Sequence, residues 1–171
     1  MIDRSAKILY GTNKVGKRFR KLLDDKQGLI LWMLFEGHLS AHSAHINFIS
    51  VSGTRATLSE VIYSPLRNVL VHEGRLPENI RITSDATIGY KEDVFILSRA
   101  IIIALLLMLI SLPFNARFKE FKTFILQFQS GLTLDLSDVW GNEHLLIAKL
   151  EKLFGMDYKP PPPHEHTSPA P

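Results

Sequence analysis

The feature that most restricts the fold is an unbroken apolar stretch, Ala100–Ile110, within the strongly hydrophobic segment Asp93–Leu112. A helix that spans a bilayer needs about 20 apolar residues, and extending this stretch to that length takes in polar residues and Pro113. A helix that is apolar on all sides belongs at the centre of a bundle or across a dimer interface. We therefore predict a buried core helix that ends at Pro113, and keep a small toxin anchored in a membrane by residues 94–114 as a third hypothesis.

The composition fits one compact domain. The chain has 171 residues, 46% of them hydrophobic, which is enough for a full core. The lack of cysteine excludes disulfides and thiolate chemistry, and no secretory signal pattern opens the chain. We expect a cytoplasmic protein without membrane contact, with one domain over residues 1–158. Residues 159–171 are rich in proline and poor in apolar residues, which predicts a disordered tail.

The net charge of +3 is unevenly spread. Residues 1–26 hold eight Lys or Arg against three Asp. Such a basic segment indicates either a solvated helix face, which is the commoner meaning of a charge run, or a surface that binds phosphates. The nucleic-acid-binding candidates in it are Lys14, Lys17, Arg18 and Arg20.

Residues 57–75 predict a helix with well-marked ends. Thr57 and Glu60 have the spacing of a capping box, apolar residues recur at helical intervals, and Gly74 suits a helix end. Pro65 lies inside this helix, where it either causes a kink or begins a second, shorter helix capped by Ser64.

Three polar residues follow Pro65 with a spacing that chance explains poorly. Arg67, Asn68 and His72 form the pattern Arg-Asn-x-x-x-His near the predicted helix end. His72 titrates near neutrality and can act as base or acid, Arg67 offers a planar fork of donors to phosphate oxygens, and Asn68 can hold the imidazole or a ribose. This set suits the cleavage of RNA by its own 2′-hydroxyl.

The pattern resembles the defining motif of the HEPN superfamily, and matching material extends from Thr57 to Asn115, as in HEPN domains of phage-defence and abortive-infection proteins. The resemblance implies a predominantly all-α, HEPN-like helical bundle and a metal-independent endoribonuclease with Arg67, Asn68 and His72 in the site, with no cofactor and no metal. HEPN motifs typically pair about a two-fold axis, so it also implies a homodimer or a second HEPN protein, with RNA as substrate and an antitoxin or effector-system partner. Arg75 is a neighbour of the motif and a candidate for nucleic-acid binding.

A second hypothesis for the same residues is a binding module without catalytic activity. Some HEPN domains are binding modules, and the long apolar helix and the proline-rich tail would suit a module that binds nucleic acid or a protein. Cleavage of unpaired RNA in the presence of EDTA separates the two readings.

Periodicity predicts the other elements. Helices are expected over Asp3–Tyr10 and over Lys14–Glu36, where Gly28 weakens the middle, and Ser50–Ala56 is expected to form a loop. A small β-hairpin is expected near residues 80–90, from Ile80–Thr83 and Thr87–Tyr90.

The last third predicts mainly helix. Phenylalanines recur at helical spacing over 115–131, which indicates a core face more strongly than a base-stacking surface. Leu132–Leu136 alternates like an extended segment, and a final helix begins at Ser137 or Asn142 and ends at Gly155.

His38, His42 and His45 would share one face if residues 37–51 continued as helix. Imidazoles one turn apart can share a zinc ion, but no obvious fourth ligand lies nearby. A polar helix face is the favoured explanation, and we expect no metal site.

Overall fold

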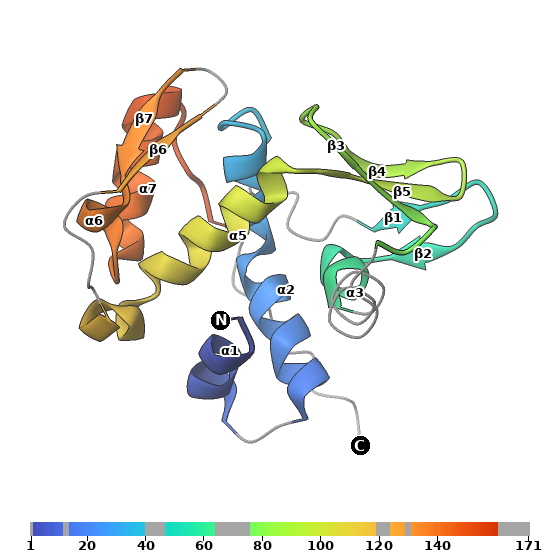
Figure 1. Ribbon diagram of the computed structural model, residues 1–171, viewed down its shortest axis with the longest axis horizontal. Coiled ribbons are helices and arrows are strands. Elements are labelled where there is room, and N and C mark those ends of the chain that lie inside the picture. The colour runs from blue at the N-terminus through green and yellow to red at the C-terminus, as the bar shows by residue number, and fades with distance from the viewer. Residues whose placement is uncertain are drawn as a thin grey trace.

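The computed structural model describes residues 2–11, 14–39, 47–63, 76–118, 124–128 and 131–160. Two helices at the centre, α2 (Val15–Leu34) and α5 (Ala100–Ser111), pack against each other. Figure 1 shows two separate groups of strands on opposite sides of this pair, with α1 (Ile2–Tyr10) beside α2. The core lies where α2 and α5 meet.

The two predicted N-terminal helices are confirmed. Gly11, with φ of +69°, follows the last residue of α1, as expected of a glycine that ends a helix. Helix α2 runs without a break through Gly28. Gly28 and every residue of Leu29–Leu34 are buried, so tertiary packing offsets the glycine's intrinsic cost of about 1 kcal/mol.

Helix α5 contains the whole apolar stretch Ala100–Ile110 and ends before Pro113, as predicted. Its buried residues include Ala104, Leu107 and Met108, whereas Ile102 is 59% exposed. Among the described residues, no helix is both long enough and apolar enough to cross a bilayer.

One strand group follows α2. β1 (Phe48–Ile49) pairs antiparallel with β2 (Arg55–Ala56), ahead of α3 (Leu58–Val61). A three-stranded sheet then has the order β3 (Ile80–Thr83), β5 (Val94–Ser98), β4 (Ile88–Lys91), with β5 parallel to β3 and antiparallel to β4. Phe95, on the central strand, packs its ring edge-to-face on Phe48 and Tyr90, which joins the sheet to β1.

The other group follows α5. The 3-10 helix η3 (Pro113–Phe118) precedes β6 (Ile125–Gln127), which pairs antiparallel with β7 (Thr133–Asp135). Helices α6 (Leu136–Val139) and α7 (Glu143–Phe154) complete it. The extended segment and the final helix were predicted: the Asn142 side chain caps α7, and Gly155 ends it with φ of +67°.

The predicted all-α, HEPN-like bundle is wrong. The described residues form three small sheets as well as helices, which makes this a mixed α/β fold. The strands that were not predicted include Arg55–Ala56, at the end of the expected loop Ser50–Ala56, and Val94–Ser98 and Ile125–Gln127, which were expected to be helical.

The hairpin predicted near residues 80–90 is also wrong in its pairing. Both segments are strands, but each pairs with β5 instead of with the other. Strand β5 had been assigned to the apolar helix, because a short apolar run suits a buried strand and a buried helix equally well. The tight turn is at Glu92 and Asp93, between β4 and β5, where Glu92 has φ of +58°.

The phenylalanine-rich helix expected over residues 115–131 is replaced, in its described part, by η3 and β6. The N–H of Gly131, which has φ of +84°, donates to the Phe128 carbonyl, and the N–H of Phe128 donates to the Leu132 carbonyl next to β7. Aromatic and β-branched residues favour strands once a partner strand is close by, and β7 is that partner for β6.

Candidate functional site

The predicted catalytic residues Arg67, Asn68 and His72, and their neighbour Arg75, lie outside the described residues. The structure describes the chain up to Tyr63 and again from Leu76. It therefore locates the two ends of residues 64–75, the motif segment, which contains the predicted catalytic residues.

The entry to the motif segment is fixed by the predicted capping box. The Glu60 N–H donates to Thr57 Oγ1 at 3.2 Å, and the Thr57 N–H donates to Glu60 Oε2 at 2.8 Å. Two otherwise unpaired backbone donors of α3 are satisfied in this way. Leu58, Val61 and Ile62 are buried in the core, so α3 is held on α2.

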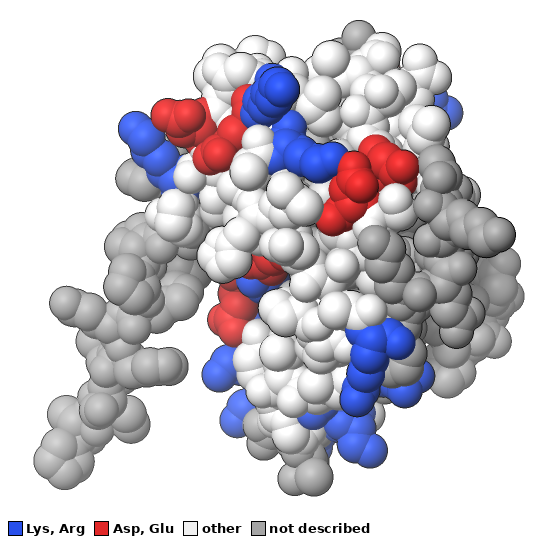
Figure 2. Space-filling model, turned by 90° about the vertical axis from the view of Figure 1, so that its left-hand side faces the viewer, with Lys and Arg blue, Asp and Glu red and all other residues white. Residues whose placement is uncertain are grey.

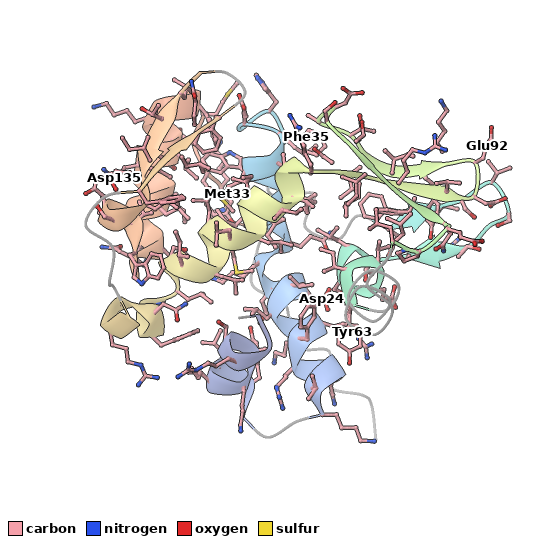
Figure 3. The ribbon with its side chains drawn as sticks, in the orientation of Figure 1. Asp24, Met33, Phe35, Tyr63, Glu92 and Asp135 are labelled. Carbon is pink, nitrogen blue, oxygen red and sulfur yellow. The ribbon has the colours of Figure 1, made fainter. Side chains whose placement is uncertain are left out.

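Tyr63 is the last described residue before the motif segment, and it packs on the first half of α2 (Figure 3). Its ring lies 5.2 Å from the Phe19 ring, and the Arg20 guanidinium carbon lies 5.2 Å from its centroid, within cation–π range. A Cβ atom at Gly16 would lie 2.6 Å from Tyr63 Oη, so only glycine allows the tyrosine ring to approach this closely. The motif segment therefore begins at the cationic end of α2.

Four of the residues predicted to bind nucleic acid, Lys14, Lys17, Arg18 and Arg20, share this end of α2. Lys14, Lys17 and Arg18, together with Lys21, which was not predicted, are spaced for one helix face, and the three lysines are exposed. Arg20 is half-buried against Tyr63. Figure 2 shows Lys and Arg side chains gathered at the lower end of the molecule, where Figure 1 places α1 and the start of α2.

Contacts between α1 and α2 fix part of this surface. Tyr10 Oη donates to Asp25 Oδ2 at 2.5 Å, and Lys21 Nζ lies 5.1 Å from the Tyr10 ring centroid. Burial, and after it the hydrogen bond to Asp25, raises the pKa of Tyr10 well above its ordinary value. The tyrosine therefore stays protonated and keeps α1 joined to α2 throughout the neutral range.

A second feature, which sequence reasoning missed, lies at the other end of α2. A pocket of about 700 Å³ opens between the end of α2, the start of α5, the loop after β3 and the end of β6. Figure 3 shows Met33 and Phe35, both of which line it, where the end of α2 meets the start of α5. The exposed Ile102 also lines it. The only sequence signal was the helix that is apolar on all sides, which had been assigned wholly to the core.

The predicted histidine cluster is not assembled on a helix within the described residues. Helix α2 ends at Leu34, and Gly37, with φ of +87°, lies just before His38. His38 is exposed and lines the pocket, whereas His42 and His45 lie outside the described residues. Among the residues that the structure describes, no three His, Asp or Glu side chains lie close enough to hold a metal ion.

Together, the fold and the site define a mixed α/β protein with a cationic helix end beside the motif segment and an apolar pocket beyond it. The chain belongs to the Rv1289 family, because the family model Rv1289 matches residues 1–157. No curated protein and no solved structure matches the chain.

Proposed function

We propose that this protein binds unpaired RNA at the cationic end of α2 and cleaves it with Arg67, Asn68 and His72. The observation that supports the proposal most directly is the packing of Tyr63 on Gly16, Phe19 and Arg20, which starts the motif segment beside the basic residues. Binding and chemistry would then draw on neighbouring parts of one surface. The proposal depends on the motif and on this surface, and it does not require an all-α bundle.

The chemistry follows from the residue types. A base removes the proton from a ribose 2′-hydroxyl, the 2′-oxygen bonds to the adjacent phosphorus, and the bond from phosphorus to the 5′-oxygen breaks. An acid protonates the departing 5′-oxygen, which leaves a 2′,3′-cyclic phosphate and a 5′-hydroxyl. His72 carries one of the two protons, Arg67 stabilises the charge that develops on the phosphate, and Asn68 orients the imidazole.

One motif supplies one imidazole, whereas the reaction uses both a base and an acid. We therefore include in the proposal a homodimer, or a pairing with a second protein of the same kind, that brings two motifs to one cleft about a two-fold axis. A role as a toxin or in phage defence, controlled by an antitoxin or effector partner, would fit such an enzyme.

The test is cleavage of a labelled unpaired RNA by the purified protein in EDTA, with DNA of the same sequence as the substrate control. The route uses the 2′-hydroxyl, so RNA should be cut to a cyclic phosphate and DNA left intact. His72→Ala should lower the rate by about 100-fold or more, the usual contribution of a general acid or base. His144→Ala, at an exposed position on α7, is the matched control and should cut at the wild-type rate. Equal rates for the wild type and His72→Ala would exclude this site.

Binding is measured separately from cleavage. Replacing Lys14 and Lys17 with Ala should weaken RNA binding and flatten its dependence on salt, because each phosphate contact releases counterions. The control pair is Lys91→Ala and Lys152→Ala, at exposed positions on β4 and α7. Salt-dependent RNA binding without any cleavage by the wild type would favour the non-catalytic module.

A further inference from the structure

The pocket at the end of α2 has a markedly apolar interior. Its volume of about 700 Å³ is within the range of roughly 300–1,000 Å³ typical of small-molecule sites. Ten of its lining residues are apolar: Met33, Leu34, Phe35, Ala86, Ala100, Ile102, Ile103, Ala104, Leu107 and Phe128. The interior therefore favours an aliphatic or aromatic body and offers little to a sugar or a nucleotide.

The polar lining residues are Glu36, His38, Arg99 and Gln127. Arg99 is exposed at the N-cap of α5, and its backbone N–H donates to the Thr83 carbonyl at 2.8 Å, which anchors the residue to the sheet. Among the described side chains, no carboxylate pairs with the Arg99 guanidinium. The N-terminal end of a helix of this length also carries partial positive charge, and here it points to the same part of the pocket, since Ala100 lines it.

We propose that this pocket binds an aliphatic monocarboxylate, with the hydrocarbon chain against α5 and the carboxylate on Arg99. A guanidinium matches a carboxylate with two parallel hydrogen bonds. The pocket offers one guanidinium and also presents the Glu36 carboxylate, so its charge suits a single negative charge better than a phosphate with two. His38 and Gln127 supply further hydrogen-bonding groups at the polar part of the lining.

The site is separate from the proposed RNA surface. Lys14 and Met33 lie near opposite ends of α2, which is roughly 30 Å at 1.5 Å per residue. Ligand binding is therefore testable without RNA and without cleavage.

The test is calorimetric titration of the full-length protein with dodecanoate and dodecylamine below their critical micelle concentrations, and with dodecanol below its solubility limit. The wild type should bind dodecanoate about tenfold more tightly than dodecanol, which corresponds to one charge-assisted hydrogen-bonding group, and dodecylamine most weakly. Arg99→Ala should abolish the preference for the acid and leave dodecanol binding unchanged. Arg81→Ala, at an exposed position on β3 outside the pocket lining, should behave as the wild type.

A separate variant tests the contact between the pocket and the hydrocarbon chain. Ile102→Glu changes a side chain that is already 59% exposed, so the fold should tolerate it, and it should weaken all three ligands. Failure of the folded wild type to bind dodecanoate would overturn the proposal, and so would an unchanged preference for the acid in Arg99→Ala. A third contrary outcome is a wild type that binds none of the ligands and self-associates, with Ile102→Glu abolishing the self-association. The last would identify the pocket as an interface with a second copy.

Discussion

At the scale of single residues, Asp135 links the last strand to the helices that follow it. Its carboxylate caps α6 by accepting the Ser137 N–H at 2.9 Å. Hydrogen bonds from the Ser137 side chain, and after them from its backbone N–H, hold the pKa of Asp135 below its ordinary value of 3.8. The charged form is therefore favoured in the folded state.

This shift predicts a loss of stability in acid. A carboxylate with a lowered pKa in the folded state stabilises the fold at every pH above its unfolded value, and the contribution is lost as the pH falls through the folded value. Asp135→Asn keeps a good capping residue but removes this titration, so its free energy of unfolding should fall less than that of the wild type between about pH 5 and pH 2. Urea unfolding across this range measures the difference. Asp157→Asn, at an exposed position, is the control, and a wild-type acid profile for Asp135→Asn would contradict the prediction.

Features whose hydrogen bonds join residues three or four positions apart were predictable from the sequence. The reciprocal bonds of Thr57 and Glu60, the Asn142 cap and the left-handed Gly155 all depend on backbone geometry over three or four residues. Arg67, Asn68 and His72 lie outside the described residues, and their roles stay predictions. The cationic side chains beside Tyr63 could be suggested from composition, but their proximity to the motif segment depends on a contact between residues 16 and 63 that no local pattern encodes.

At the scale of elements, two left-handed glycines near α7 form a matched pair. Gly141 has φ of +71°, and a Cβ atom there would lie 2.5 Å from Ala116 Cα in η3. Its N–H also donates to the Ile110 carbonyl at 2.8 Å, which ties the α6–α7 junction to α5. Gly155 has a similar φ of +67° but nothing within 4 Å.

Alanine should therefore cost much more at one glycine than at the other. Gly155→Ala should cost about 1–2 kcal/mol of unfolding free energy, the price of a left-handed alanine. Gly141→Ala adds a backbone clash of about 1–3 kcal/mol, for a total of roughly 2–5 kcal/mol. Chemical denaturation of both variants measures the difference, and equal losses would show that η3 does not pack against Gly141 in solution.

Strand pairing is where prediction of elements failed. β3 and β4 were predicted as strands because polar and apolar residues alternate in them, yet their common partner β5 is mostly apolar and lies only one residue, Arg99, before α5. Periodicity does not distinguish a buried strand from a buried helix over so few residues. What separates them is the close turn at Glu92 and Asp93, and its effect depends on the strands that it brings together.

At the scale of the whole molecule, an ion pair joins α2, near the start of the chain, to α7, the last helix of the described residues. Lys26 Nζ on α2 lies 2.7 Å from Glu143 Oε2 on α7, with both side chains less than a quarter exposed. Contacts between such distant parts of the chain set the mixed fold, and they are the contacts that a single sequence does not reveal. Tyr158, in the segment after α7, is joined to α2 as well, through the buried Trp32.

The segment after α7 should therefore contribute to stability only as far as Tyr158. The Trp32 ring is 1% exposed and packs edge-on to Phe154 at 5.2 Å and Tyr158 at 5.3 Å, while the Tyr158 N–H donates to Glu151 Oε1 at 2.8 Å. Burial, with the nearby Glu143 charge, raises the pKa of Tyr158 to about 12, so the phenol stays neutral and packed through the physiological range.

Truncation after Pro160 should leave the unfolding free energy within about 0.5 kcal/mol of the full chain, since the removed residues have almost no apolar surface to bury. Truncation after Phe154 should cost roughly 2–4 kcal/mol and shift the Trp32 emission to longer wavelength as water reaches the indole. The measurement uses a Trp140→Phe background, so that Trp32 is the only indole. Tyr158→Ala should reproduce most of the loss and Tyr158→Phe little of it, because the ring contact provides the stabilisation. Equal stability of the two truncated chains would mean that Tyr158 does not cover Trp32 in solution.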